Sequence, residues 1–252
     1  MGFLGQVAGW FTDPGNWSGS DGIPVRIGEH LVLAGMPLLL AVGVALPIGL
    51  YIGHTGRLSN LAINISNIGR AIPTLAILVI AWLLLSRPLV ELGLRRDAAE
   101  ITTGLAMAAL ALPPIVTNTY VGLSAVDRDL VEAARGMGMT GRQVLWRLEL
   151  PIALPVVLAG LRTAAVQVVA TATLGAVLGT GGLGRYLIDG IAQRRYEEMF
   201  AGAMLVALLA ILTELFFAWL QRRTLSPGVL PVRERGLREP GQAGRSGGEL
   251  IA

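Results

Sequence analysis

The 252-residue chain contains no cysteine and no lysine, and it has only two histidines, His30 and His54. Without cysteine, disulfides, iron–sulfur clusters and thiol chemistry are excluded. A P-loop needs a lysine after GxxxxG, so this chain cannot bind a nucleotide in that way. The two histidines, both expected outside the apolar segments, are too few for a histidine-rich metal site. They also cannot complete a catalytic set of a nucleophile, a base and an orienting group. The sequence therefore predicts no catalytic residue, metal or cofactor in this chain.

Charged residues are scarce as well. They make up 15% of the chain against 53% hydrophobic residues, with a mean hydropathy of +0.63, which does not fit a water-soluble surface. Crossing a hydrocarbon core of ~30 Å takes about 20 helical residues, and five apolar segments are long enough. They are residues 31–53, 68–86, 100–122, 152–178 and 199–220. The sequence predicts an all-α, polytopic membrane protein with about five transmembrane helices.

Prolines lie inside these apolar segments. A proline breaks a helix in water, but in a membrane neighbouring groups can satisfy the carbonyl that it frees. We therefore expect kinked helices rather than loops at Pro37, Pro47, Pro73, Pro113, Pro114 and Pro155.

The two ends of the chain differ from its middle. Residues 1–28 carry Trp10, Phe11 and Trp17 and are expected to form an extracytoplasmic or interfacial segment. The first 20 residues contain no lysine or arginine, unlike a secretory signal. Residues 223–252 are rich in proline, glycine, arginine and glutamate and lack aromatic side chains. Such a segment buries too little surface to offset the entropy of ordering, so we expect a disordered tail.

A polar loop of residues 124–150 separates the third and fourth apolar segments. Its pattern predicts two short helices broken near residues 136–141, with Asp127 or Asp129 capping the first and Thr140 the second. Each helix is expected to have one packing face, and the second to lie along the membrane surface. The packing faces are Leu130, Ala133 and Ala134, then Val144, Leu145 and Leu148, with Arg142, Arg147 and Glu149 left polar. Such a helix can dock in a partner's groove, although a plain amphipathic connector would show the same pattern.

The spacing within this loop resembles the signature of the membrane subunits of bacterial ATP-binding-cassette (ABC) importers. Residues 132–134 read EAA, Gly138 follows after three residues, and LELP at residues 148–151 follows after nine more, where the family has isoleucine in place of the first leucine. The resemblance covers residues 29–222. It implies a type I ABC importer transmembrane domain, which needs a second permease, identical or related, to enclose a pathway.

Other segments are similar to the osmoprotectant subfamily, whose substrates include glycine betaine, choline and carnitine. They read IGRAIPTLA at residues 68–76, LPPIVTNTY at 112–120, EAARGMG at 132–138, and TATLG at 171–175 followed by GTGGLG at 179–184.

By this resemblance the loop is a coupling helix, which sits in a cleft of a separate cytoplasmic ATPase and transmits its opening and closing to the spans. The implied coupling residues are Glu132, Ala133, Ala134, Arg135, Gly136, Gly138, Leu150 and Pro151. The partner ATPase binds ATP and magnesium, and this chain is a translocation subunit, not an enzyme. The other implied partners are an extracytoplasmic binding protein, the second permease and membrane lipid, with no nucleic acid.

Five spans place the two termini on opposite sides of a membrane. With the loop and the C-terminus in the cytoplasm, eight arginines near the spans lie inside and seven outside, a weak positive-inside bias. The orientation therefore depends mainly on the resemblance. We predict a multi-pass protein of the bacterial inner membrane, with the N-terminus outside and the C-terminus in the cytoplasm.

Two ionisable residues, Arg162 and Glu214, fall within the apolar segments, where charges are rare. They lie at comparable depth, so an interhelical ion pair is plausible, either as a packing clamp or on a transport path. Three polar residues in the spans either line such a path or bond to neighbouring backbone: Asn118, Thr171 and Thr173.

Two glycine patterns have simple structural explanations. Residues 179–184 match the GxGxxG dinucleotide fingerprint in form, but a membrane helix and not a strand precedes them. We expect a tight turn at the outer end of the fourth span, which shapes an outer gate or only ends the helix. Gly49 and Gly53, four residues apart, permit close contact between helices.

The sequence leaves other functions open. Methionine, taurine or a phosphonate stays open as the solute, because the spans show no aromatic cage for a quaternary ammonium. An ion-driven secondary transporter would show internal repeats and several ionisable groups at the midplane, which this sequence lacks. The leading prediction is the permease subunit of an ATP-driven importer for an osmoprotectant.

Overall fold

The computed structural model describes residues 2–224, apart from the side chains of residues 61, 62, 65, 66 and 70. The predicted all-α fold is confirmed, because this part of the chain forms helices and no strand, and five helical stretches could cross a membrane. These stretches are α2 (Ile23–Thr55), α4 (Thr74–Glu91), α5 (Ala98–Ser124), Gly141–Leu178 and α10 (Tyr196–Thr224). The fourth joins α7 (Gly141–Val144), the π-helix η2 (Leu145–Glu149), α8 (Leu150–Thr171) and the 3-10 helix η3 (Ala172–Leu178). The remaining elements are α1 (Phe3–Thr12), η1 (Pro14–Trp17), α3 (Ser59–Ala71), α6 (Arg128–Gly136) and α9 (Gly184–Ala192).

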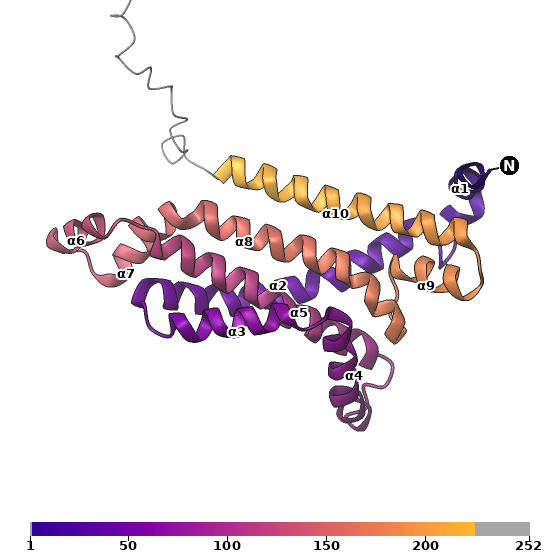
Figure 1. Cartoon of the computed structure of the whole chain (residues 1–252), viewed down its shortest axis with the longest axis horizontal. Coiled ribbons are helices and arrows are strands. Elements are labelled where there is room, and N and C mark those ends of the chain that lie inside the picture. The colour runs from indigo at the N-terminus through magenta and orange to yellow at the C-terminus, as the bar shows by residue number, and fades with distance from the viewer. Residues whose placement is uncertain (1, 225–252) are drawn as a thin grey trace, which may run out of the picture.

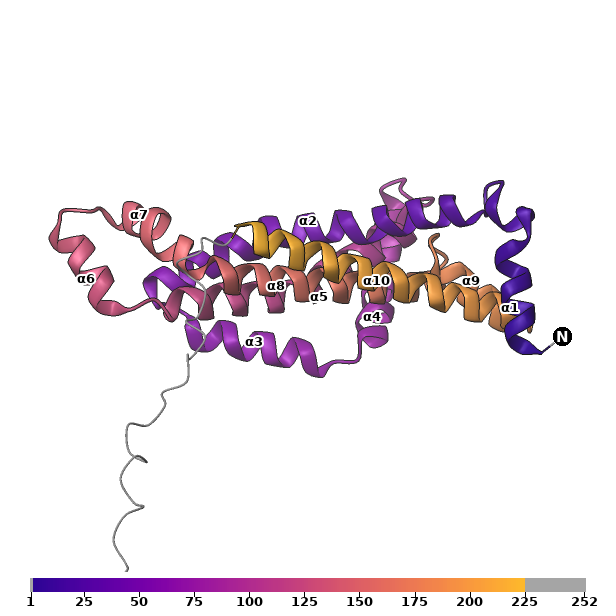
Figure 2. The same cartoon turned by 90° about the horizontal axis from the view of Figure 1, so that it is seen from above.

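The long helices form an elongated bundle. In Figures 1 and 2, α2, α5, α8 and α10 run along its long axis, while α4 projects away from it. One end carries α6 and α7, and the other carries α1 and α9 (Figure 1). The C-terminal end of α10 points towards the end that carries α6 and α7, so this end and the N-terminus lie apart.

Small residues line the central contacts of the bundle. Ala34, Ala41 and Ala45 of α2 share one buried cluster with Ala108 and Ala111 of α5. In a membrane, where lipid is as apolar as leucine, close backbone approach through small side chains replaces the hydrophobic drive of water. The alanine-rich sequence of these two helices therefore explains why they pack most closely along the bundle axis.

Two glycines of α2 make the tightest of these contacts. A Cβ atom added at Gly49 would stand 2.7 Å from Thr119 Cβ, and one added at Gly53 would stand 2.7 Å from Leu123 Cβ. Both distances are below van der Waals contact, so only glycine fits. The predicted close contact thus forms within the chain, between α2 and α5.

The expectation of helices rather than loops at the prolines is confirmed at every position except Pro73. Five prolines lie inside continuous helices: Pro37, Pro47, Pro113, Pro114 and Pro155. At Pro73 the chain leaves α3, and α4 begins at Thr74, so the predicted span of residues 68–86 is wrong at its start. A proline disfavours the α conformation of the residue before it, and Ile72 is extended here, with φ −81° and ψ 130°.

The N-terminal segment packs on the bundle. The Trp10 ring stands edge-on to Tyr186 of α9, with 5.3 Å between centroids, and the Tyr186 hydroxyl donates a 2.6 Å hydrogen bond to the Asp21 carbonyl. Burial raises the pKa of Tyr186 to about 12, which keeps this donor protonated. Residues 1–28 were predicted as one unit, but α2 already begins at Ile23.

The other boundaries also shift. The helix α10 continues to Thr224, and the predicted tail beyond it lies outside the described residues. The helix α2 extends beyond the predicted apolar segment of residues 31–53 at both ends and includes His30 and His54. The apolar pattern alone could not show this extension, because tertiary contacts satisfy the polar residues at both ends of the helix.

Candidate functional site

The loop between α5 and α8 folds as the sequence predicts at its helix starts. The Asp127 carboxylate accepts a 2.9 Å hydrogen bond from the Asp129 N–H and caps α6. Thr140 and Gln143 form a reciprocal capping box at α7, in which the Thr140 N–H donates to Gln143 Oε1 at 2.8 Å. Both caps satisfy N–H groups that the first turn of a helix leaves unpaired.

Gly138 has a backbone role that only glycine fills without strain. Its φ is +86°, in the left-handed region. This conformation lets the Met139 N–H donate a 3.1 Å hydrogen bond back to the Ala134 carbonyl, which ends α6 and turns the chain towards α7. Gly136, by contrast, lies in the last turn of α6 without a positive φ. The fixed position of Gly138 in the signature therefore has a conformational cause.

The inner face of the loop differs in part from the prediction. Ala134 and Val144 are buried as expected, and they share a cluster with Val126 and Val131. Leu130, predicted on the packing face, is 49% exposed, because α6 is rotated so that Val131 points inwards. This rotation could not be predicted from the sequence, because Leu130 and Val131 are adjacent and both apolar.

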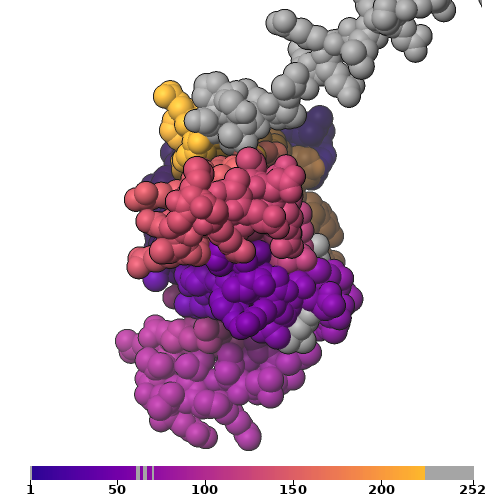
Figure 3. All heavy atoms as spheres, turned by 90° about the vertical axis from the view of Figure 1, so that its left-hand side faces the viewer, coloured from indigo at the N-terminus to yellow at the C-terminus, as the bar shows by residue number. Residues whose placement is uncertain are grey.

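The outer face presents polar and apolar side chains together. Leu130, Ala133 and Met137, at helical spacing, all face outwards, and Met137 is 78% exposed. Trp146 of η2 is 53% exposed. Seen from this end of the molecule, the loop forms one continuous surface beside the turn between α2 and α3 (Figure 3). An exposed apolar face with a charged rim has the character of a protein-binding surface.

The predicted coupling residues divide between this face and the interior. Glu132, Ala133, Arg135, Gly136 and Gly138 are exposed, as is Pro151. Ala134 is buried, and Leu150 packs against the cluster of Leu50, Leu123, Ala153 and Val157. Leu130, Met137 and Trp146 were not predicted as part of the outer face, and exposed apolar residues are visible only once the helices are placed.

An unpredicted pair joins the loop to α2. Glu149, expected to stay on the polar side, is only 6% exposed, and its Oε2 lies 2.5 Å from His54 Nδ1. Gly141, at the start of α7, also lies over the same ring, since a Cβ there would be 3.5 Å from His54 Nε2. The end of α2 therefore contacts both α7 and η2, and Glu149 is buried because it has this partner.

The charged and polar residues predicted within the spans make two kinds of contact. Arg162 of α8 and Glu214 of α10 form the interhelical ion pair considered above. Asn118, Thr171 and Thr173 each donate a 2.8 Å hydrogen bond to a carbonyl three or four residues earlier in the chain. Of the two alternatives predicted for these residues, the structure shows hydrogen bonds to neighbouring backbone. A role of the three residues in lining a transport path stays a prediction.

The glycine loop after η3 is a turn, as expected. Gly179 and Gly182 have φ of +92° and +84°, and no strand precedes them in the described chain. The Gly182 N–H donates a 2.7 Å hydrogen bond to Glu29 Oε2 of α2. A Cβ at Gly181 would stand 2.5 Å from the same oxygen, so the turn is pressed against this carboxylate.

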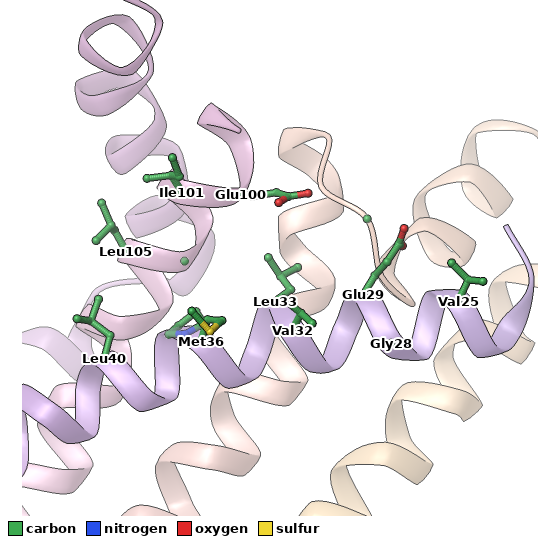
Figure 4. A pocket seen from close by; sticks show the side chains of 13 residues that line it. Val25, Gly28, Glu29, Val32, Leu33, Met36, Leu40, Glu100, Ile101 and Leu105 are labelled. Carbon is green, nitrogen blue, oxygen red and sulfur yellow. The ribbon is translucent and has the colours of Figure 1, made fainter. Parts of the chain in front are cut away.

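Next to this turn, a pocket of about 840 Å³ lies between the N-terminal halves of α2 and α5 (Figure 4). In Figure 1, the N-terminal halves of both helices lie away from α6. Figure 4 shows Glu100 of α5 extending towards the end of the pocket where Glu29 stands. The rest of the wall is largely apolar, including Val32, Leu33, Met36, Leu40, Ile101 and Leu105. The described part of the chain holds no group of three or more histidine, aspartate or glutamate side chains placed to share a metal ion.

Comparisons with known proteins agree with this architecture. The family model described as "Binding-protein-dependent transport system inner membrane component" matches residues 45–226. The carnitine transport permease protein OpuCB of Listeria monocytogenes is 32% identical over 212 residues, which cover 84% of this chain and 92% of the relative. The choline transport system permease protein OpuBD of Bacillus subtilis (strain 168) is 33% identical over 228 residues, 90% of this chain and 93% of the relative.

A solved structure supports the fold. The inward-facing MetNI methionine ABC transporter matches with a TM-score of 0.66 and 23% identity, over 80% of this chain and 95% of that chain. At this identity the match shows the fold alone, and it confirms the predicted type I importer transmembrane domain. The chain belongs to the family of binding-protein-dependent ABC importer membrane components, as its signature loop predicted.

Proposed function

We propose that this chain is the permease subunit that moves an osmoprotectant such as glycine betaine, choline or carnitine inwards in an ATP-driven importer. The relatives named above carry carnitine and choline permease names and match over more than four-fifths of the chain. The observation that supports the mechanism is the loop, because its outer face is exposed at one end of a bundle of membrane-length helices.

The outer face of the loop docks on a separate cytoplasmic ATPase. Leu130, Ala133 and Met137 supply apolar contact, while Glu132 and Arg135 supply charge at the rim. ATP hydrolysis occurs in that partner, and this chain catalyses no reaction of its own. In this proposal the loop and the C-terminus lie in the cytoplasm and the N-terminus lies outside.

Two further partners complete the importer. A second permease, identical or related, closes the pathway against this bundle, and an extracytoplasmic binding protein delivers the solute to the opposite end. Movement of the ATPases then displaces the loops and rocks the helices, so that the solute pathway opens alternately to each side of the membrane.

The test is uptake of radiolabelled glycine betaine and choline in transport-deficient cells. The chain is co-expressed with its neighbouring ATPase, binding-protein and second permease genes, with and without Glu132→Lys. The matched control is Glu91→Lys, which reverses an exposed carboxylate at the end of α4, away from the loop. We expect ATP-dependent uptake that Glu132→Lys abolishes, with membrane insertion intact, and that Glu91→Lys preserves.

The other outcomes separate the alternatives. Normal uptake and normal ATP hydrolysis with Glu132→Lys would refute the docking role of the loop. An assembled complex that transports neither solute would leave the permease assignment and redirect the solute to another small molecule, such as methionine, taurine or a phosphonate. Uptake that needs no ATPase gene would instead indicate an ion-driven transporter.

A further inference from the structure

The pocket between α2 and α5 combines apolar walls with an acidic end. Its volume of about 840 Å³ lies in the range of small-molecule sites. It is lined by residues of the N-terminal halves of both helices, at the end of the bundle opposite the loop (Figures 1 and 4). In the proposed importer, this is the end that receives the solute from the binding protein.

The two carboxylates in the pocket wall differ in their freedom. Glu29 is fixed, because its Oε2 accepts hydrogen bonds from the Gly182 N–H at 2.7 Å and from Arg26 at 2.8 Å. Arg26 also forms an ion pair with Asp21, with 2.5 Å between Arg26 Nη2 and Asp21 Oδ1. Glu100 is exposed and makes no ion pair with any side chain that the structure describes. Arg26 thus pairs with two carboxylates, and the pocket wall itself carries two carboxylates, Glu29 and Glu100, and no basic side chain.

We propose that this pocket binds a small organic cation, and that Glu100 makes the permease favour choline over zwitterionic solutes such as glycine betaine and carnitine. The proposal rests on the importer function above. The methyl groups of a quaternary ammonium contact the apolar wall, and its positive charge lies near Glu100 and Glu29. A solute that also carries a carboxylate brings a negative charge into the same acidic end, where like charges repel.

The glycines around the pocket provide the room for this solute. Gly181 lies against Glu29 Oε2, where a Cβ would be only 2.5 Å away, so the turn leaves the pocket open while it holds that carboxylate. Gly104 of α5 lines the wall, and a Cβ there would meet Pro37 Cγ at an ordinary 3.5 Å. An alanine therefore fits at Gly104, whereas a longer side chain must extend into the pocket or displace Pro37.

The experiment uses the assembled complex in proteoliposomes with saturating, solute-loaded binding protein. Under this condition the binding protein no longer sets the rate, and a site in the permease affects turnover. We expect Glu100→Gln to lower the choline rate by about threefold to tenfold, the size of one partly solvated charge interaction, and to leave the glycine betaine rate equal or higher. The matched control, Glu91→Gln, removes an exposed carboxylate outside the pocket and should change neither rate.

A steric variant tests the location independently of charge. Gly104→Leu should slow both solutes, and Gly104→Ala should transport both at close to the normal rate. If Glu100→Gln slows both solutes equally, or changes neither, the selective role of the carboxylate is refuted. If Gly104→Leu transports normally, lipid or the second permease fills the pocket and the site assignment is refuted. Each of these results leaves the importer function standing. The assignment of an osmoprotectant as the solute fails instead if the unmodified complex transports neither choline nor glycine betaine.

Discussion

The contact between His54 and Glu149 allows a prediction with a stated magnitude. His54→Ala removes the only described partner of a carboxylate whose side chain is 8% exposed. Breaking one side of a buried pair costs about 3–5 kcal/mol, and the His54 side chain keeps 19% exposure, so we expect about 3 kcal/mol. The loss falls on the attachment of the loop to α2, since the rest of the bundle core does not include these residues.

The assay is a double-mutant cycle on the purified complex. Thermal stability and solute-stimulated ATP hydrolysis are measured for His54→Ala, Glu149→Ala and the double variant. We expect each single variant to lose stability and coupling, while the double variant loses little more than either one, because it buries no unpaired charge. Strict additivity, or a stability change below about 0.5 kcal/mol for His54→Ala, would refute a structural role for the pair.

Two predictions concern glycines, each with a matched control. Gly138→Ala should destabilise the loop by about 1 kcal/mol and weaken its association with the ATPase, because φ is +86° at Gly138. The control Gly136→Ala should be neutral or slightly stabilising, because Gly136 has no positive φ. Equal effects of the two variants in a pull-down with the ATPase would contradict this prediction. Gly160→Ala should lower the melting temperature by separating α5 from α8, because its Cβ would stand 2.5 Å from Asn118 Cβ, whereas Gly43→Ala meets no atom within 4 Å. Indistinguishable melting of these two variants would show that the interface relaxes freely.

The sequence predicted the elements of this protein well, because the bilayer constrains them strongly. Membrane-length apolar runs and helix caps are local properties, and the structure confirms the five spans and the caps at Asp127 and Thr140. The span predicted to begin at residue 68 was wrong because Pro73 separates two helices instead of kinking one. Whether neighbouring groups can satisfy a broken turn is a tertiary property, so composition alone could not decide between the two.

The faces of the helices were less predictable than their positions. The rotation that exposes Leu130 and buries Val131 changes the hydrophobic pattern by one residue only. Glu149 looked like a surface residue because its partner His54 is far away in the sequence and belongs to another span. Local patterns carry no information about such pairs, and the docking face and the joint beneath it therefore required the structure.

The two ends of the molecule share one element, which has consequences for how they communicate. The 33-residue helix α2 lines the pocket near Glu29 and contacts the loop through His54. At about 1.5 Å per residue, these two points lie roughly 38 Å apart along it. Between them, Gly49 and Gly53 pack the helix tightly on α5, the helix that forms the other wall of the pocket. Since α5 supplies Glu100 and Gly104, we predict that a force on the loop reaches both walls of the pocket through α2 and its contact with α5, without any contact between loop and solute.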